Sequence, residues 1–357
     1  MKLFTVGPVA CYPEVLEAMG RQMVSHRSKE YLELHYETVR LLQDFISTKN
    51  QVFLFSSTGT GFMEASVRNC VRKKIVCCIN GSFGERFAEV AESNGVGLVK
   101  LAPPLGQPVS AEELNRILDA NPDVEAVALT HNETSVGLIN PLHELAPVVK
   151  DHGKLLFVDA VSSMGGTEID VDALGIDVCF SSSQKCFGVP PGLGMGSVSE
   201  QALALSAEAR NKGWYFDFKV WEEDQKNGHG TPVTSVIPQI AGLNTALKMI
   251  ERKGGKKWYF DLYKSRNTRI RQGIEKLGLS TFPKKGCESP TVNCINAPAG
   301  MKGGAVYDKM RQREFELAQG YGQIKEKTFR IGNMGYIEMS DIDLMLNALS
   351  EVISQKN

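Results

Sequence analysis

The sequence lacks an excess of charge of either sign, because 40 lysines and arginines face 41 aspartates and glutamates and leave a formal net charge of −1. This balance gives no electrostatic reason to expect a nucleic-acid or membrane-surface partner. No apolar stretch approaches the length of a membrane span. The first residues, MKLFTVGPVACYPEV, contain no apolar core before the first proline, so we expect no signal peptide.

The cysteines lack the spacing of a metal site or of a disulfide framework. No two of them form a CxxC pair, and several stand inside apolar runs such as KKIVCCIN. We therefore expect no metal, no disulfides and a reducing, cytoplasmic location. The eight cysteines are residues 11, 70, 77, 78, 179, 186, 287 and 294.

Short apolar runs alternate with helical patterns through the first two-thirds of the chain. The runs are rich in β-branched and aromatic residues and do not alternate strictly with polar ones, which is typical of strands buried on both faces. The expected strands are Val52–Phe55, Ile75–Ile79, Leu98–Leu101, Ala126–Thr130, Leu155–Val158 and Val178–Ser181. The expected helices between them are Gly61–Arg72, Phe83–Ser93, Ala111–Leu118 and Leu142–Asp151. This order predicts an α/β fold with a mainly parallel sheet.

After about Pro238 the pattern changes to two long helices and shorter mixed elements. We therefore expect a large domain over residues 1–240 and a smaller C-terminal α+β domain over residues 241–357, on which the N-terminal segment can also pack. The expected elements of the second part are Ile240–Arg252, Lys256–Leu277, Thr291–Asn296, a helix from Ala305, the run Lys327–Gly335 and a helix from Asp341.

Three segments that follow strands carry the chemistry, because ligands of a parallel sheet gather at the carboxyl ends of its strands. The first is SSTGTGFMEA, residues 56–65, which leads from a strand into a helix. Its free backbone N–H groups and hydroxyls favour an anion, most naturally a phosphate. An ordinary glycine-rich turn between strand and helix is an equally good interpretation of this segment alone.

The other two segments contain Asp159, in LLFVDAVSS, and Lys185, in SSSQKCFGVPPGLGMG. A carboxylate at the end of a buried strand needs a cation or several donors, although an aspartate that caps the following turn is the commoner case. Most lysines lie at the surface, but a lysine between an apolar strand and a rigid Gly/Pro loop is partly desolvated. Desolvation lowers its pKa and favours the nucleophilic amine.

Together a phosphate cradle, a strand-end carboxylate and a buried lysine are the three contacts that hold pyridoxal 5'-phosphate. We expect Lys185 to form a Schiff base with this cofactor and then to act as the general base. Asp159 would keep the pyridine nitrogen protonated.

Further motifs extend over nearly the whole chain, in the order VGPV, HRS (26–28), STGTGFMEA, NGSFGER (80–86), HNETSVG (131–137), VDAVSSMGG (158–166), SSSQKCFGVPPGLG, GTPVTS (230–235) and FRIGNMG (329–335). In number and order they resemble the class V (fold type I) pyridoxal-phosphate aminotransferases, closest to the alanine/serine–glyoxylate and serine–pyruvate group. The resemblance implies a seven-stranded large domain, a homodimer with shared active sites, and transamination between alanine or serine and glyoxylate or pyruvate.

The resemblance also implies roles for individual residues. Arg330 would clamp the substrate α-carboxylate, for which its planar fork is suited. The cofactor-binding residues would be Thr58, Gly59, Thr60 and Gln184 at the phosphate, Phe83, Thr134 and Val161 around the ring, and Thr231 at the phosphate of the neighbouring subunit.

The chain departs from the family pattern in two places. Many relatives have a tyrosine three positions before the equivalent of Thr231, where this chain has Gly228; His229 is the residue that could compensate. Val136 replaces a threonine of the ETSTG motif, so one local hydrogen bond is lost.

Three alternatives stay open at the level of sequence. An aspartate aminotransferase would use a pocket arginine such as Arg27. A cysteine desulfurase would need a reactive cysteine such as Cys287, but those enzymes usually place histidine, not Gln184, before the lysine. A binding protein that has lost catalysis would have no need of Lys185, Asp159 and Arg330.

Overall fold

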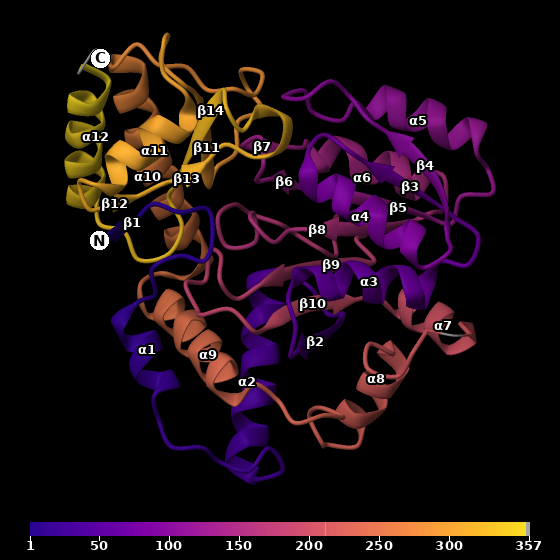
Figure 1. Ribbon diagram of the computed structural model, residues 1–357. Coiled ribbons are helices and arrows are strands. Elements are labelled where there is room, and N and C mark those ends of the chain that lie inside the picture. The colour runs from indigo at the N-terminus through magenta and orange to yellow at the C-terminus, as the bar shows by residue number, and fades with distance from the viewer. Residues whose placement is uncertain (211, 355–357) are drawn as a thin grey trace.

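The computed structural model describes residues 1–210 and 212–354. Its centre is a seven-stranded sheet with the order β2-β10-β9-β8-β5-β3-β4 (Figure 1). All neighbouring strands run parallel except β10, which is antiparallel to both β2 and β9. The strands are β2 (Gln51–Phe55), β3 (Lys74–Cys78), β4 (Gly97–Leu101), β5 (Ala126–Thr130), β8 (Leu155–Asp159), β9 (Val178–Ser182) and β10 (Gly194–Val198).

Six of these strands were predicted within one residue at each end, and β10 was missed. Its sequence, GMGSV, has no apolar run and two glycines, which are poor strand formers. The glycines are needed because the neighbouring strand β9 approaches closely: a Cβ on Gly196 would lie 2.8 Å from the Cβ of Phe180. The mainly parallel α/β sheet itself is as predicted.

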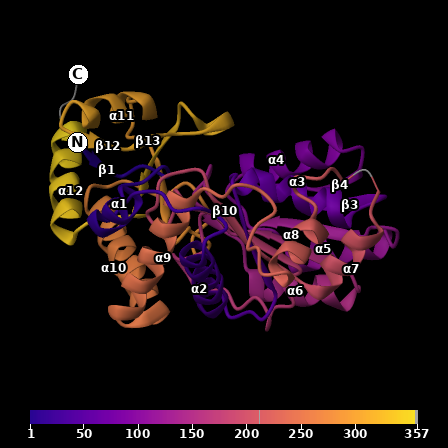
Figure 2. The same cartoon turned by 90° about the horizontal axis from the view of Figure 1, so that it is seen from below.

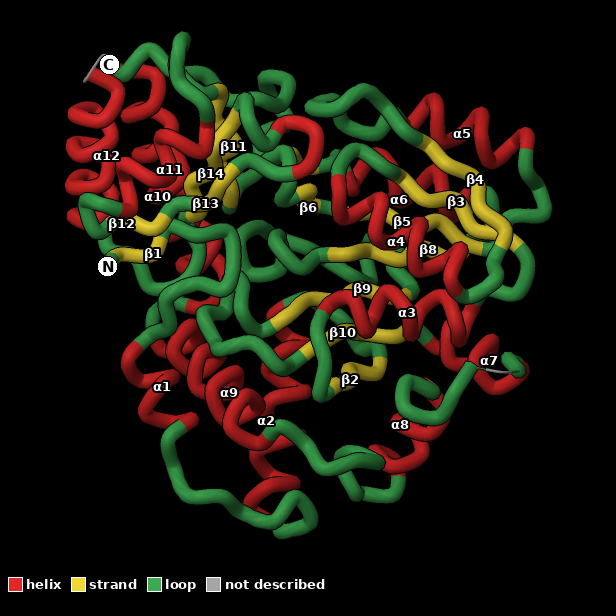
Figure 3. The backbone as a smooth tube through the Cα atoms, in the orientation of Figure 1, coloured by secondary structure: helices red, strands yellow, loops and turns green. Residues whose placement is uncertain are grey.

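Helices cover both faces of the sheet, and each face has its own apolar core (Figures 1 and 3). Alternate strand residues enter the two cores, for example Phe53 and Phe55 on one side and Val52 and Leu54 on the other. The first core is covered by α3 (Gly59–Cys70), α4 (Ser82–Ser93), α7 (Glu200–Glu208) and α8 (Phe218–Lys226), and the second by α2 (Lys29–Phe45), α5 (Ala111–Ala120) and α6 (Leu142–Asp151).

A second, smaller sheet with the order β11-β14-β13 lies at one end of the large one. With its helices it encloses a third apolar core (Figure 2). The chain start joins this part, because Lys2 of β1 pairs in parallel with Phe315 of β12. The elements are β1 (Lys2–Leu3), β11 (Val292–Asn296), β12 (Phe315–Glu316), β13 (Ala318–Gln319), β14 (Thr328–Gly332), α10 (Gly255–Lys276), α11 (Gly303–Arg311) and α12 (Met339–Ser354).

The expected division at residue 240 falls inside α9 (Ile237–Arg252), which packs against α1 (Pro13–Met19) and α2. The remaining short elements are β6 (Asn132–Glu133), β7 (Leu138–Ile139) and the 3-10 turn η1 (Gly322–Ile324). Within the described ranges no helix combines the length and the apolar character needed to cross a membrane.

Candidate active site

The carboxyl ends of the parallel strands bring several of the expected residues to one edge of the large sheet. Thr58 follows β2, Phe83 follows β3, Asp159 ends β8 and Lys185 follows β9. Asp159 and Lys185 lie close enough for each to shift the pKa of the other. The topology of the sheet therefore brings four segments that are distant in sequence to the same edge.

Lys185 lies in a turn and is only 8% exposed. Its Nζ donates a hydrogen bond to the carbonyl oxygen of Val6, at 2.5 Å. Burial lowers the pKa of Lys185 to about 8, against an attraction to the nearby Asp159 carboxylate that raises it. About a tenth of the amine is therefore neutral and nucleophilic at pH 7, far more than for a lysine with an ordinary pKa.

The N-terminal segment closes over this lysine, a contact that sequence reasoning did not find although it noted the VGPV motif. Gly7 has φ +112°, and a Cβ there would lie 2.6 Å from Lys185 Nζ and 2.8 Å from its Cε. Gly7 thus has both a backbone conformation and a close approach that favour glycine.

We expect Gly7→Ala to lower the fraction of protein that takes up cofactor covalently by about tenfold or more, because the new methyl group displaces the Lys185 amine. Gly278→Ala is the matched control: its φ is also positive, +72°, but nothing lies within 4 Å of the added Cβ. Titration with cofactor, followed by visible absorbance, measures the difference. Equal loading of the two variants would contradict this role of Gly7.

Asp159 is 3% exposed, and its Oδ1 accepts one hydrogen bond, 2.9 Å from the Val161 backbone nitrogen. Burial raises the pKa of Asp159 to about 7, although the Val161 amide, Lys185 and Arg86 all lower it. One backbone donor does not compensate a buried carboxylate, so this group is suited to a cationic partner.

The Thr58–Thr60 loop forms the N-terminus of α3, with Thr58 as its N-cap residue. Gly59 has no room for a side chain, since a Cβ would lie 2.4 Å from Val161 Cγ2. Among the described residues the buried Ser56 hydroxyl has no hydrogen-bond partner. Free amides, hydroxyls and the helix dipole together favour a bound anion.

Phe83 and Thr134 lie beside the same edge. The buried Glu133 carboxylate accepts hydrogen bonds from the backbone amides of Phe83 (3.0 Å) and Gly84 (3.1 Å) and from Ser135, which fixes the start of α4. The Thr134 hydroxyl is 2.6 Å from that of Ser162. Sequence reasoning did not identify Glu133, although its place in HNETSVG was visible.

Gln184 and Val161 complete the predicted set around Lys185. Gln184 Oε1 accepts a hydrogen bond of 2.6 Å from the Ser182 hydroxyl, which leaves its amide nitrogen for another acceptor. Val161 is half-buried and packs against Gly59. Both therefore lie where contact with a group bound between the Thr58–Thr60 loop and Lys185 is possible.

Arg330, on β14, reaches from the small sheet to the large one. It is 6% exposed, and it donates from Nε to the Gln319 carbonyl (2.9 Å) and from Nη1 to the Thr134 carbonyl (3.0 Å). Burial lowers the pKa of Arg330 below its ordinary value, yet the guanidinium stays charged at neutral pH. Within the described chain no hydrogen bond from Nη2 is found, so this side of the fork can meet a carboxylate.

Thr231 lies apart from this group and is fully buried within its own chain. Its hydroxyl donates to the Val233 carbonyl (2.8 Å) and lies 2.7 Å from that of Ser235. Contact with a phosphate in another subunit would require these bonds to be exchanged, so that role stays a prediction. The neighbouring His229 is bonded to Asp224, with 3.0 Å between Nδ1 and Oδ1.

Arg27 is bonded to the loop that contains Thr231. Its Nη1 donates to the carbonyls of His229 and Thr231, both at 2.7 Å. Sequence reasoning instead missed Arg86, on α4, which lies with its Cζ 5.0 Å from the centre of the Phe83 ring. Arg86 also helps to lower the pKa of Lys185 and opposes part of the rise in the pKa of Asp159.

These groups fit pyridoxal 5'-phosphate. The anion-binding loop suits its phosphate, the undercompensated Asp159 suits a protonated ring nitrogen, and Lys185 supplies a buried amine. Among the described residues no cluster of three or more histidine, cysteine, aspartate or glutamate side chains could hold a metal. The arrangement is that of a pyridoxal-phosphate enzyme.

Comparison with known proteins identifies the family. The model of the class V aminotransferases matches residues 10–343. An uncharacterized aminotransferase of Methanocaldococcus jannaschii is 33% identical over 341 residues, which cover 93% of this chain and 87% of that protein. The chain therefore belongs to the class V aminotransferases, is an aminotransferase, and has pyridoxal 5'-phosphate as its cofactor.

Two crystal structures share the whole fold. Alanine–glyoxylate aminotransferase from Nostoc sp. has a TM-score of 0.94 and 30% identity, covering 98% of this chain and 94% of that one. Aspartate aminotransferase from Thermus thermophilus has a TM-score of 0.91 and 28% identity, covering 99% of both chains. The fold and family expected from the sequence are thus confirmed.

Proposed function

We propose that this enzyme transfers an amino group between a small amino acid, alanine or serine, and a 2-oxo acid, glyoxylate or pyruvate, with Lys185 as the residue that binds the cofactor covalently. The observation that carries the proposal is the buried amine of Lys185, which lies within electrostatic reach of both Asp159 and Arg330. When bound, pyridoxal 5'-phosphate supplies an aldehyde that condenses with amines and a ring that accepts electron density from the substrate's α-carbon.

Each residue then has a separate task. Asp159 holds a proton on the ring nitrogen through its carboxylate. Lys185, once its amine is released, moves a proton at the substrate's α-carbon, for which a pKa of about 8 is well placed. Arg330 orients the substrate through the carboxylate. The Thr58–Thr60 loop and Gln184 bind phosphate, and Phe83, Thr134 and Val161 surround the ring.

Two considerations support small neutral substrates. Arg27, which only the aspartate alternative would use as a second cation, is bonded to backbone carbonyls, and the Nostoc relative is named for alanine and glyoxylate. Aspartate is the second candidate, because the Thermus relative is named for it. Among the described residues no carboxylate lies within ion-pair distance of Arg86, which stands beside Phe83 and could pair with the side-chain carboxylate of aspartate.

Desulfuration of cysteine is less well supported. Cys287 is 9% exposed, its Sγ lies 2.9 Å from the Lys284 carbonyl, and burial raises the pKa of the thiol. A reactive thiolate needs the opposite environment.

We also propose that the enzyme works as a homodimer, in which the Thr231 loop of one subunit binds phosphate in the other. Large exposed apolar side chains support an interface near this loop, for example Met23 (52%) and Val24 (40%). Arg27, from the same segment, ties it to the backbone of Thr231.

A half-reaction screen tests the proposed substrates. Single amino acids are mixed with the cofactor-loaded enzyme, and loss of its visible band is followed. We expect alanine or serine to react faster than other neutral amino acids. Preference for aspartate that is lost in Arg86→Ala would favour the second candidate. Sulfide release from cysteine that Cys287→Ala abolishes would overturn the proposal in favour of a lyase.

A further inference from the structure

Tyr321 is an aromatic residue at the site that neither the sequence motifs nor the proposed chemistry uses. It lies in the loop between β13 and η1 and is 40% exposed. Its ring is stacked beside Phe83, with 6.4 Å between the centroids and 20° between the planes. On the small-sheet side, Arg330 Cζ lies 5.4 Å from the centre of the Tyr321 ring. One side chain therefore spans the gap between the expected ring-stacking residue and the expected carboxylate clamp.

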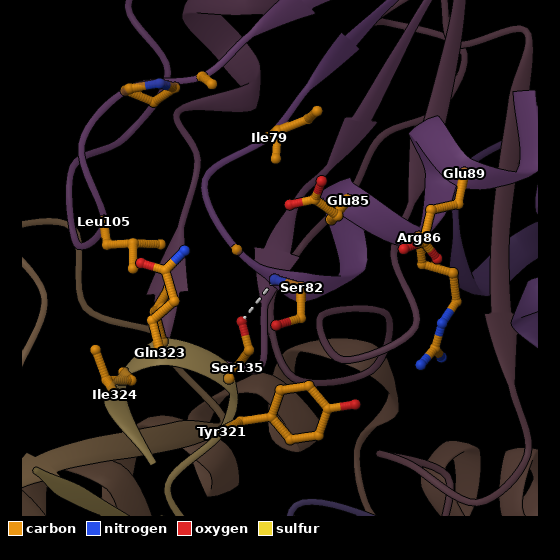
Figure 4. A pocket seen from close by; sticks show the side chains of 15 residues that line it. Ile79, Ser82, Glu85, Arg86, Glu89, Leu105, Ser135, Tyr321, Gln323 and Ile324 are labelled. Atoms are coloured by element: carbon orange, nitrogen blue, oxygen red, sulfur yellow. Dashed lines mark hydrogen bonds between the residues drawn. The ribbon is translucent and has the colours of Figure 1, made fainter. Parts of the chain in front are cut away.

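A cavity of about 470 Å³ adjoins Tyr321 (Figure 4). Apolar side chains of Leu105, Val136 and Ile324 contribute to its lining. Figure 4 shows Tyr321 at one side of this space, beside Ser135, with its hydroxyl directed toward the side where the Arg86 guanidinium lies. The cavity could hold the side chain of a large amino acid.

Lys185, Asp159 and Arg330 do not line this cavity, whereas Tyr321 lines it and also contacts Arg330. A substrate carboxylate bound by Arg330 would bring the substituent on the α-carbon close to the same ring. A methyl or hydroxymethyl group needs little space there. A benzyl group would need the space that the Tyr321 ring fills.

We propose that Tyr321 is a specificity-determining residue, whose ring separates the Lys185 site from the 470 Å³ cavity and restricts the enzyme to substrates with small side chains. The inference rests on the proposed function, because it takes Arg330 as the carboxylate clamp. Shape is what matters: in the described chain the Tyr321 hydroxyl makes no hydrogen bond, whereas its ring makes both contacts. Phenylalanine should therefore serve in its place.

The test compares kcat/KM for alanine and for phenylalanine as donors in the cofactor-loaded enzyme. We expect the ratio of alanine to phenylalanine to fall about tenfold or more in Tyr321→Ala and Tyr321→Leu, mainly through a lower KM for phenylalanine. Tyr321→Phe should keep the wild-type ratio. Tyr336→Ala is the matched control, since Tyr336 is also 40% exposed but does not line the cavity. An unchanged ratio in both truncated variants would overturn the proposal.

A binding measurement on the wild-type holoenzyme needs neither turnover nor a truncated variant. Calorimetry should give a Kd for 3-phenylpropionate about tenfold or more above that for propionate. Equal affinities would show that the Tyr321 ring does not limit the size of the ligand's side chain, and would also overturn the proposal. The two proposals can fail separately. If the wild type transfers the amino group of no small amino acid, the proposed function fails. If propionate still binds about tenfold or more tightly than 3-phenylpropionate, the role of Tyr321 stands.

Discussion

Lys185→Ala should yield a folded protein that binds pyridoxal 5'-phosphate only reversibly and transfers amino groups roughly 1,000-fold more slowly or worse, because a covalent attachment and a positioned general base are lost together. Among the described residues the Lys185 side chain makes a single hydrogen bond, to the Val6 carbonyl, so the surrounding turn should persist without it. Visible absorbance after gel filtration reports the attachment, and single-turnover kinetics with alanine reports the rate.

Lys285→Ala is the control for this variant, since Lys285 is an exposed lysine in the loop before β11. It should keep both the visible band and the wild-type rate. A Lys185→Ala protein that retains the band through gel filtration would mean that another amine holds the cofactor.

Asp159→Asn should bind the cofactor but transfer amino groups about 100-fold more slowly or worse, because an amide cannot hold the ring nitrogen in its protonated, electron-accepting form. Single-turnover rates of the loaded variant measure this loss. A turnover number near that of the wild type would contradict the role of Asp159. Asp172→Asn offers a comparison: Asp172 is an exposed carboxylate that accepts hydrogen bonds from Thr48 and Lys49, just before β2.

The same substitution has an effect on stability whose sign follows from the pKa of Asp159. Burial raises this pKa from 3.8 to about 7, so between these values the folded protein without cofactor binds more protons than the unfolded chain. Its free energy of unfolding therefore falls as the pH rises from about 4 to about 7, by an amount on the order of a few kcal/mol.

Asparagine does not ionise, so Asp159→Asn should lose this dependence and gain in urea midpoint relative to the wild type as the pH rises through the same range. The comparison is made without cofactor, because a bound cation would restore the ionised carboxylate. A wild-type advantage that grows with pH would contradict the buried, undercompensated environment of Asp159.

The sequence predicted the strand ends well because their signals are local. Runs such as Ala126–Thr130 are apolar on both faces, and the residues that follow them must lie at one edge of a parallel sheet. The antiparallel β10 could not be found this way, since its glycines serve contacts with Phe180 and Thr58 that are distant in sequence. Only the family resemblance implied a seventh strand.

Contacts between distant segments were the other omission. Nothing in VGPV indicates that the Val6 carbonyl accepts a hydrogen bond from Lys185, 179 residues away in sequence. Nothing in QGYGQ places Tyr321 between Phe83 and Arg330. Arg27, which the aspartate alternative would use as a pocket cation, is a further example, because the sequence does not show that its Nη1 bonds to the carbonyls of His229 and Thr231. The motifs identified the reacting groups, whereas the fold determines which side chains and backbone groups lie next to them.

The attachment of the cofactor to Lys185 is tested most directly by borohydride reduction of the loaded enzyme, followed by proteolysis and mass spectrometry. The structure leads us to expect the reduced cofactor on the peptide that contains Lys185, and on no other lysine in appreciable amount. Recovery of the modification on a different lysine, or of unmodified Lys185 peptide from a fully loaded and reduced sample, would contradict the assignment.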